Sequence, residues 1–187
     1  MLTDFAGKIA GALAIAGYIP YIVAILRKQT RPSKATWLIW ATIDILVVGS
    51  YFGAGARSTL WVPIAFMVGA STVAMLSVKY GEKSWAPLDI GCLVGAAISV
   101  ALWLALNSLA ALLVNILIMA LGTIPTIRKV YLDPSGESRL AWMLFLFSCG
   151  ANLFAVERWL FAIAVYPICV FAFDCAIAIL IFWPRKK

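Results

Sequence analysis

The sequence predicts an all-α integral membrane protein with seven transmembrane helices, and its composition, its apolar segments and an internal repeat all point to this class. Of 187 residues, 64% are hydrophobic and only 12% are charged, and the mean hydropathy is +1.00. A soluble domain of this size could not hide so much apolar surface, so lipid must be the solvent for much of it. The formal charge of +7 lies in short gaps between apolar segments, a pattern of membrane orientation and not of nucleic-acid binding.

Seven apolar segments are long enough to cross a bilayer, since about 20 helical residues span the hydrocarbon core. They cover 5–26, 36–53, 60–79, 87–106, 108–128, 140–156 and 159–183. Polar or glycine-containing breaks separate most of them: Arg27-Lys28, Gly53 to Arg57, Asn107-Ser108 and Glu157-Arg158. Each segment is therefore expected to form one membrane-spanning helix.

The chain contains an internal duplication. Six residues recur 105 positions later without a gap, and a second block of four recurs at an offset of 104. The pairs are Gly17/Gly122, Ile19/Ile124, Pro20/Pro125, Ile22/Ile127, Ser33/Ser138 and Trp37/Trp142, followed by Pro63/Pro167, Ile64/Ile168, Ala74/Ala178 and Leu76/Leu180. The repeat predicts two three-helix units, 1–83 and 108–187, joined by a linker helix within 84–107. Duplicated bundles in membranes usually flank a solute site.

The distribution of lysine and arginine predicts the orientation. One side of the membrane would carry 12 basic residues and the other only Lys8, Arg57 and Arg158. This places the N-terminus outside and the C-terminus in the cytoplasm. The basic loop 128–139 gives the second unit the same orientation as the first, so one extra crossing is required between them. The segment 87–106 supplies it, and we expect a 3+1+3 order with parallel repeats in a cell (inner) membrane.

With these features the chain resembles the SWEET and PQ-loop transporter superfamily. The likeness covers seven helices in 3+1+3 order and a proline repeated in the first and fifth helices, as Pro20-Tyr21 and Pro125-Thr126, where the family pattern has Pro-Gln. A narrower likeness links Trp37-x-x-Trp40-x-x-x-Asp44 to the Trp-x-x-Trp-x-x-x-Asn motif of PnuC-type vitamin-precursor facilitators. Here aspartate replaces asparagine, and the motif lies in the first repeat. The resemblance implies alternating-access transport of a sugar, nucleoside or vitamin-like solute.

Two acidic residues are expected near the middle of membrane helices. Asp44 and Asp174 each cost about 2.5–3.5 kcal/mol at such a depth, and neither has a basic residue in its own span. Each must face a wet cavity, bind a cation, accept hydrogen bonds or stay protonated. A substrate or proton site is one interpretation, and a packing residue between helices is the other. Two carboxylates in one cavity would favour a shared proton and pH-dependent transport.

Four further residues are candidates for substrate binding. Trp37 and Trp40 share a helix face with Asp44, where an indole wall suits a flat solute or a cation, although Trp37 also fits an interfacial position. Phe171 shares a face with Asp174 and Pro167. Asn115 offers hydrogen bonds from the fifth helix.

The repeated Gly17-x-x-Pro20 and Gly122-x-x-Pro125 motifs predict a pair of hinges. Proline removes a hydrogen bond from the helix ladder and kinks the chain. A static kink that improves packing is the alternative.

Several function classes lack support in the sequence. Histidine is absent and the four cysteines have no metal-ligand spacing, so we expect no metal, no cofactor, no catalytic residues and no enzyme. We expect a carrier for a small polar metabolite, neutral or cationic, that is facilitative or proton-coupled and works without nucleic acid. A non-transporting receptor or sensor of the same fold is the alternative. A homo-oligomer is left open.

Overall fold

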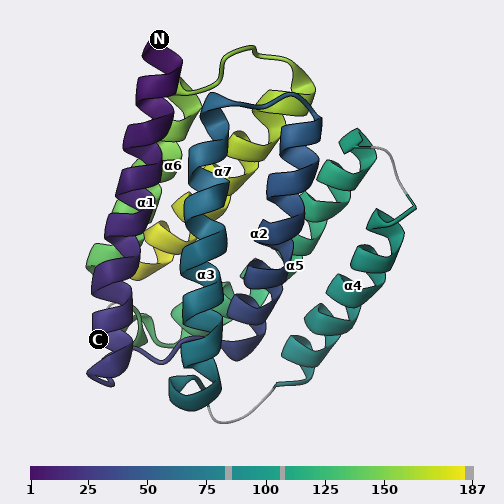
Figure 1. Ribbon diagram of the computed structural model, residues 1–187. Coiled ribbons are helices and arrows are strands. Elements are labelled where there is room, and N and C mark those ends of the chain that lie inside the picture. Colours follow the sequence, from purple (N-terminus) through teal and green to yellow (C-terminus); the bar gives the residue numbers. More distant parts are fainter. Residues whose placement is uncertain (83–85, 106–107, 184–187) are drawn as a thin grey trace.

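The computed structural model describes residues 1–82, 86–105 and 108–183, and the regular structure in these ranges is entirely helical. Seven α-helices and two short 3-10 helices follow one another along the chain (Figure 1). The α-helices are α1 (Leu2–Leu26), α2 (Lys34–Gly53), α3 (Trp61–Tyr80), α4 (Pro87–Trp103), α5 (Ser108–Leu132), α6 (Arg139–Phe154) and α7 (Phe161–Phe182). The 3-10 helices are η1 (Ser58–Leu60) and η2 (Pro134–Gly136). The all-α prediction is thus confirmed for the described residues.

Five of these helices are long and apolar enough to cross a membrane, which indicates a multi-pass membrane protein. They are α1, α2, α3 with η1, α5 and α7. The α6 helix has 16 residues, a length of about 24 Å at about 1.5 Å per residue. It is shorter than the expected segment 140–156 because Ala155 closes it as C-cap. The end of the expected segment 87–106 and the basic residues Lys83 and 185–187 lie outside the described residues.

The repeated serines begin equivalent helices. The Ser33 hydroxyl accepts a hydrogen bond from the Thr36 backbone N–H at 3.3 Å, and Ser138 does the same for Ala141 at 3.4 Å. A serine N-cap satisfies one of the backbone donors that a helix start leaves unpaired. This explains in physical terms why serine recurs at positions 33 and 138.

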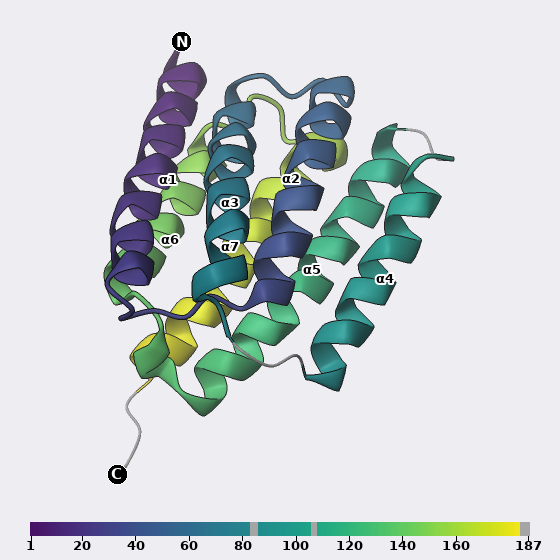
Figure 2. The same ribbon diagram turned by 60° about the horizontal axis from the view of Figure 1, so that its bottom comes forward.

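Six helices form a closed ring, in the order α1, α3, α2, α5, α7, α6 and back to α1. Helices α1, α3, α5 and α7 run downward in Figure 1, whereas α2, α4 and α6 run upward. The α4 helix packs mainly on α5 and lies outside the ring at one edge (Figure 2). Helices of the first repeat meet those of the second at two main places, α1 against α6 and α2 against α5. These two contacts are equivalent under the sequence repeat.

An aromatic ring of one repeat lies against a glycine of the other at both of these contacts. A Cβ atom added to Gly17 on α1 would lie 2.7 Å from the Phe145 ring on α6. A Cβ atom on Gly122 of α5 would lie 2.7 Å from Ile39 Cγ2 and 3.0 Å from the ring of Trp40 on α2. Trp40 and Phe145 are 105 residues apart, like the two glycines. The repeated glycines therefore provide room for equivalent aromatic side chains.

We predict that Gly17→Ala and Gly122→Ala each lower the melting temperature of the purified protein in detergent. The expected loss is about 1–3 kcal/mol, because an extra methyl group must displace a packed ring. Gly49→Ala is the matched control, since Gly49 lies within α2 and a Cβ atom there would meet nothing within 4 Å. That substitution should be neutral or stabilise by about 0.5–1 kcal/mol. Equal effects at the three positions would show that close packing is not the reason for glycine at 17 and 122.

Candidate functional site

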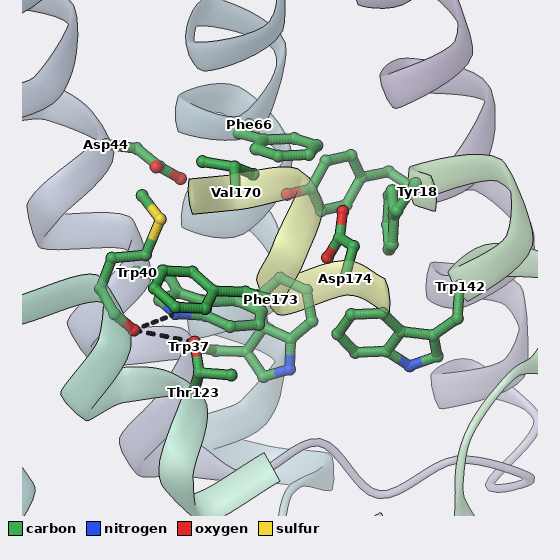
Figure 3. Close-up of a pocket in the computed structure, with 12 residues that line it drawn as sticks. Tyr18, Trp37, Trp40, Asp44, Phe66, Thr123, Trp142, Val170, Phe173 and Asp174 are labelled. Atoms are coloured by element: carbon green, nitrogen blue, oxygen red, sulfur yellow. Dashed lines mark hydrogen bonds between the residues drawn. The ribbon is translucent and has the colours of Figure 1, made fainter. Parts of the chain in front are cut away.

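A small enclosed cavity lies in the middle of the ring, and every helix of the ring contributes to its wall. Its volume is about 40 Å³. It is lined by Tyr18, Trp37, Trp40, Asp44, Phe66, Met119, Thr123, Trp142, Phe145, Val170, Phe173 and Asp174, which Figure 3 shows as sticks. The space can hold a few water molecules at most, since a single water needs about 10–15 Å³ by this kind of measure. The cavity in this conformation is therefore too small for a sugar or a nucleoside.

The cavity wall follows the internal repeat. Eight of the residues form four equivalent pairs, one member from each repeat, at offsets of 105 or 104. The pairs are Tyr18/Thr123, Trp37/Trp142, Trp40/Phe145 and Phe66/Val170. Equivalent residues of the two repeats thus surround one space.

Two pairs of the wall exchange large and small side chains. The Tyr18 ring fills the space beside Gly69, where an added Cβ atom would lie 2.1 Å from the ring. At the equivalent place, residues 123 and 173 are threonine and phenylalanine. Tyr18 and Gly69 of the first repeat thus correspond to Thr123 and Phe173 of the second. The large ring therefore comes from the first helix of one repeat and the third helix of the other, which makes the shape of the cavity asymmetric.

Asp44 and Asp174 both line this cavity, from α2 and α7 respectively, and their carboxylates extend toward it (Figure 3). Asp44 is 3% exposed and Asp174 is 6% exposed. Among the described residues neither carboxylate forms an ion pair, and Asp44 accepts no hydrogen bond. The structure therefore brings together the two acids that the sequence singled out.

The thiol of Cys149 lies beside one of these acids. Its sulfur is 3.0 Å from Oδ2 of Asp174, a distance at which the S–H group donates a hydrogen bond. Cys149 occupies the position equivalent to Asp44, 105 residues later, and Ala70 occupies the position equivalent to Asp174, 104 residues earlier. Each repeat thus contributes one acid, but from different helices of the three-helix unit.

Aromatic rings form most of the remaining wall. The Trp37 and Trp40 rings are 5.2 Å apart between centroids at 80°, and the Tyr18 and Phe145 rings are 4.8 Å apart. Trp37 Nε1 donates to the Tyr21 hydroxyl at 3.3 Å, and Trp40 Nε1 donates to the Met119 carbonyl at 3.4 Å. Since both indole N–H groups already bind protein acceptors, the rings offer apolar and π surface to the cavity.

Asn115 and Phe171 lie away from the cavity. Asn115 is fully buried between α5 and α2, where its amide donates to Ser50 Oγ at 3.2 Å. Phe171 lies beside Gly150 of α6, and Phe173 lines the cavity from α7 instead. Both residues contact protein in this conformation, and their predicted substrate contacts stay predictions.

Several residues that line the cavity were not predicted from the sequence, because an aromatic side chain is common in an apolar helix. The repeat would have identified most of them. Residues equivalent to Trp37 and Trp40 are Trp142 and Phe145, and both line the cavity. Tyr18 follows the conserved Gly17 directly. Mapping the acidic motif onto the second repeat would therefore have added the opposite wall.

A buried ionic cluster closes the lower side of the ring, where α1 and α5 end. The Lys129 ammonium binds the Glu137 carboxylate and the backbone carbonyl of Arg31. The other carboxylate oxygen of Glu137 accepts a hydrogen bond from Trp142 Nε1 at 2.9 Å. Glu137 is 6% exposed. This cluster, which we call the lower latch, joins the loop of the first repeat to the cavity residue Trp142.

Water reaches the outer side of the lower latch. Lys129 and Arg31 also line a polar hollow of about 710 Å³, together with both acidic and basic side chains. Glu82 borders the same hollow, and partial burial raises the pKa of its carboxyl. The latch thus separates a wet, charged surface from the small apolar cavity above it.

Hydrogen bonds between the repeats also close the upper side. The Tyr51 hydroxyl on α2 donates to the Ile163 carbonyl on α7 at 2.5 Å, and the Glu157 carboxylate accepts from the Ser58 backbone N–H. The rings of Tyr51 and Tyr166 lie 5.1 Å apart. Contacts between the repeats therefore lie on both sides of the cavity in this conformation.

Fold and site together define a multi-pass helical membrane protein with an enclosed central cavity that contains two carboxylates. Comparison with protein-family models, curated proteins and solved structures yields no match to the chain. The cavity itself is thus the basis for inferring a function.

We predict that Glu137→Gln destabilises the protein, because it leaves the partly buried Lys129 ammonium, whose side chain is 11% exposed, without its counter-charge. Removal of one partner of a fully buried ion pair costs about 3–5 kcal/mol, so this pair should lose less than that. The matched control is Asp4→Asn, which removes one partner from the exposed Asp4–Lys8 pair at 2.8 Å. Surface pairs contribute about 0–1 kcal/mol. Melting curves in the same detergent test this, and equal losses for both variants would contradict a structural role for the latch.

Proposed function

We propose that the protein is a membrane carrier that moves a small polar metabolite by alternating access. The observation behind this proposal is the central cavity, which is walled by equivalent residues of both repeats and contains two carboxylates that form no ion pair among the described residues. Polar groups at such depth are costly and usually line a solute or ion pathway. A cavity between two repeated bundles is also the usual place of a carrier's substrate site.

The proposed architecture is a 3+1+3 arrangement of parallel repeats. Helices α1–α3 form the first unit (1–83), α4 is the inversion linker (84–107), and α5–α7 form the second (108–187). The order of helices around the ring supports it, because α1, α3, α2 on one side correspond to α5, α7, α6 on the other. The position of α4 outside the ring also supports its role as a connector. The resemblance to the SWEET and PQ-loop superfamily adds fold-level analogy.

The proposed orientation places the N-terminus outside a cell (inner) membrane and the C-terminus in the cytoplasm. Support comes from the excess of lysine and arginine at the lower ends of the helices, where Arg27, Lys28, Arg128 and Lys129 lie. The lower latch would then be a cytoplasmic gate, and the Tyr51 and Glu157 contacts would form the external one.

Transport in this scheme needs the two gates to open in turn. The closed cavity of about 40 Å³ corresponds to an occluded state without substrate. Rocking of one three-helix unit against the other would separate Lys129 from the Arg31 carbonyl on one side, or Tyr51 from Ile163 on the other. The motion would pass through the two glycine contacts, α1 with α6 and α2 with α5. Pro20 and Pro125 lie inside α1 and α5, one turn beyond these glycines, and we keep them as proposed hinges.

Cysteine accessibility tests the proposal, since Cys149 is 1% exposed and reports on the cavity. We predict that a variant with Cys92, Cys169 and Cys175 changed to alanine reacts slowly at Cys149 with a membrane-impermeant methanethiosulfonate reagent from either side of the membrane. Adding Glu137→Gln should raise the rate from the proposed cytoplasmic side only. Inside-out and right-side-out vesicles separate the two directions.

An unchanged rate at Cys149 from the cytoplasmic side in the Glu137→Gln variant would contradict the proposed cytoplasmic gate and favour the receptor or sensor alternative. Solute uptake into liposomes completes the test. A panel of sugars, nucleosides, vitamins and amines is measured with and without a pH gradient, which separates a facilitator from a proton-coupled carrier. A Trp40→Ala variant should lose uptake, because it removes an indole ring that lines the cavity together with Asp44 and packs on Gly122.

A further inference from the structure

We infer that the solute in the central cavity is a small organic ammonium ion, which binds between Asp44 and Asp174 in exchange for a proton. This inference rests on the proposed carrier function and narrows its substrate class. It starts from what the cavity wall offers to a ligand: negative charge, hydrogen-bond acceptors and aromatic faces.

The first observation is uncompensated negative charge. Among the residues that the structure describes, the cavity wall contains two carboxylates and no lysine or arginine, and the chain has no histidine. Both acids are more than nine-tenths buried, and Asp44 has no polar partner among the described residues. Buried charges in proteins are normally paired. A cationic ligand is the partner that this site lacks.

The other ionisable groups around the acids cannot supply that charge. Tyr18 on α1, Tyr166 on α7 and Cys149 on α6 all interact electrostatically with Asp44, and Cys149 and Cys175 interact with Asp174. Each of these groups is neutral or becomes negative when it loses a proton. Only a proton or a cation from outside the protein can therefore balance the two acids.

The second observation is a shortage of hydrogen-bond donors in the wall. All three indole N–H groups donate to protein acceptors, namely Tyr21, Met119 and Glu137. The Thr123 hydroxyl donates to the Met119 carbonyl at 2.8 Å. A sugar presents many hydroxyl oxygens that need donors, and here most donors are occupied. An ammonium group needs acceptors alone, and the two carboxylates provide them.

The third observation is the aromatic wall. Rings of Tyr18, Trp37, Trp40, Phe66, Phe145 and Phe173 line the cavity together with the two acids. Faces of aromatic rings attract cations, and this attraction increases when the cation is desolvated. Alkyl groups on the nitrogen would also bury apolar surface against these rings. The combination distinguishes an organic cation from a bare metal ion, which prefers oxygen ligands all round.

The exchange keeps the charge of the cavity constant. Without solute, a proton lies on one of the two carboxylates and reduces their repulsion. When the ammonium ion enters, the O–H bond of that carboxylic acid breaks and the proton passes to water on the open side. The nitrogen keeps all its own bonds and pairs with the carboxylate. One positive charge thus replaces another, and the reverse steps release the solute.

Paired ligands of equal shape test the inference. Choline, ethanolamine and putrescine are titrated into the purified full-length protein, and 3,3-dimethylbutan-1-ol serves as the uncharged match of choline. Tryptophan fluorescence and melting temperature report binding. We expect at least one of the cations to bind, no binding of the uncharged alcohol at the same concentration, and release of about one proton per bound cation in weak buffer. Failure of all three cations, or equal binding of the alcohol, overturns the inference.

Variants then locate the site. Asp44→Asn and Asp174→Asn should each weaken cation binding at least about tenfold, because a buried charge pair loses one partner. Asp4→Asn changes an exposed acid in the first turn of α1 and should leave the affinity for the cation unchanged. Unaltered affinity in both cavity variants would overturn the inference. Because the choline pair is compared in the wild-type protein, the test survives a variant that does not fold.

Liposome flux keeps this inference separate from the proposed function. If a cation binds with these properties but no solute in the panel crosses the membrane, the carrier function fails and the cation site stands. If a neutral solute is transported and no cation binds, the carrier function stands and the cation site is overturned. Transport of the cation with opposite proton movement supports both.

Discussion

The ring of helices depends on one packing contact that the fold makes twice, an aromatic ring placed against a glycine of the other repeat. Lipid offers helices no hydrophobic reason to associate, so association depends on close van der Waals packing and hydrogen bonds. Gly122 lets Trp40 approach α5, and Gly17 lets Phe145 approach α1. These contacts join α2 to α5 and α1 to α6, and thereby close the ring. The same two rings then form opposite walls of the cavity, so helix packing and site geometry share the same residues.

The two repeats are alike in the residues that begin their helices and pack them together, but several of their side chains in the cavity differ. Equivalent helices start at equivalent serine caps and meet at equivalent glycines. Inside the cavity, however, tyrosine faces glycine in one repeat and threonine faces phenylalanine in the other. Acids are also divided, with Asp44 on α2 and Asp174 on α7. The repeats thus differ in several side chains that a ligand would touch, while the glycine contacts that shape the ring are retained.

Much of this arrangement can be predicted from the sequence, because hydropathy and repeats act locally along the chain. Seven helices follow from apolar segments, and the cavity acids follow from the cost of charge in a membrane. Positions of Asn115 and Phe171 could not be predicted, since a few degrees of helix rotation decide which neighbour a side chain meets. The lower latch was not predicted: Lys129 lies in the last turn of α5 and Glu137 eight residues later, and the charges of this segment have no distinctive pattern. Its burial depends on Arg31 and Trp142, which come from distant parts of the chain.

The division of the acids between the repeats links charge to motion. Asp44 belongs to the first three-helix unit and Asp174 to the second, so any rocking of one unit against the other changes the distance between the two carboxylates. Separating two like charges from about 5 to about 8 Å, at an effective dielectric of about 20, lowers their repulsion by about 1 kcal/mol. A proton or a cation between the two carboxylates turns their net repulsion into attraction, because each carboxylate is then attracted to the same positive charge. Binding of positive charge would therefore draw the units together around the cavity, whereas its loss would favour an open state. Two acids on one helix could not act in this way, since their separation would stay fixed while the units move.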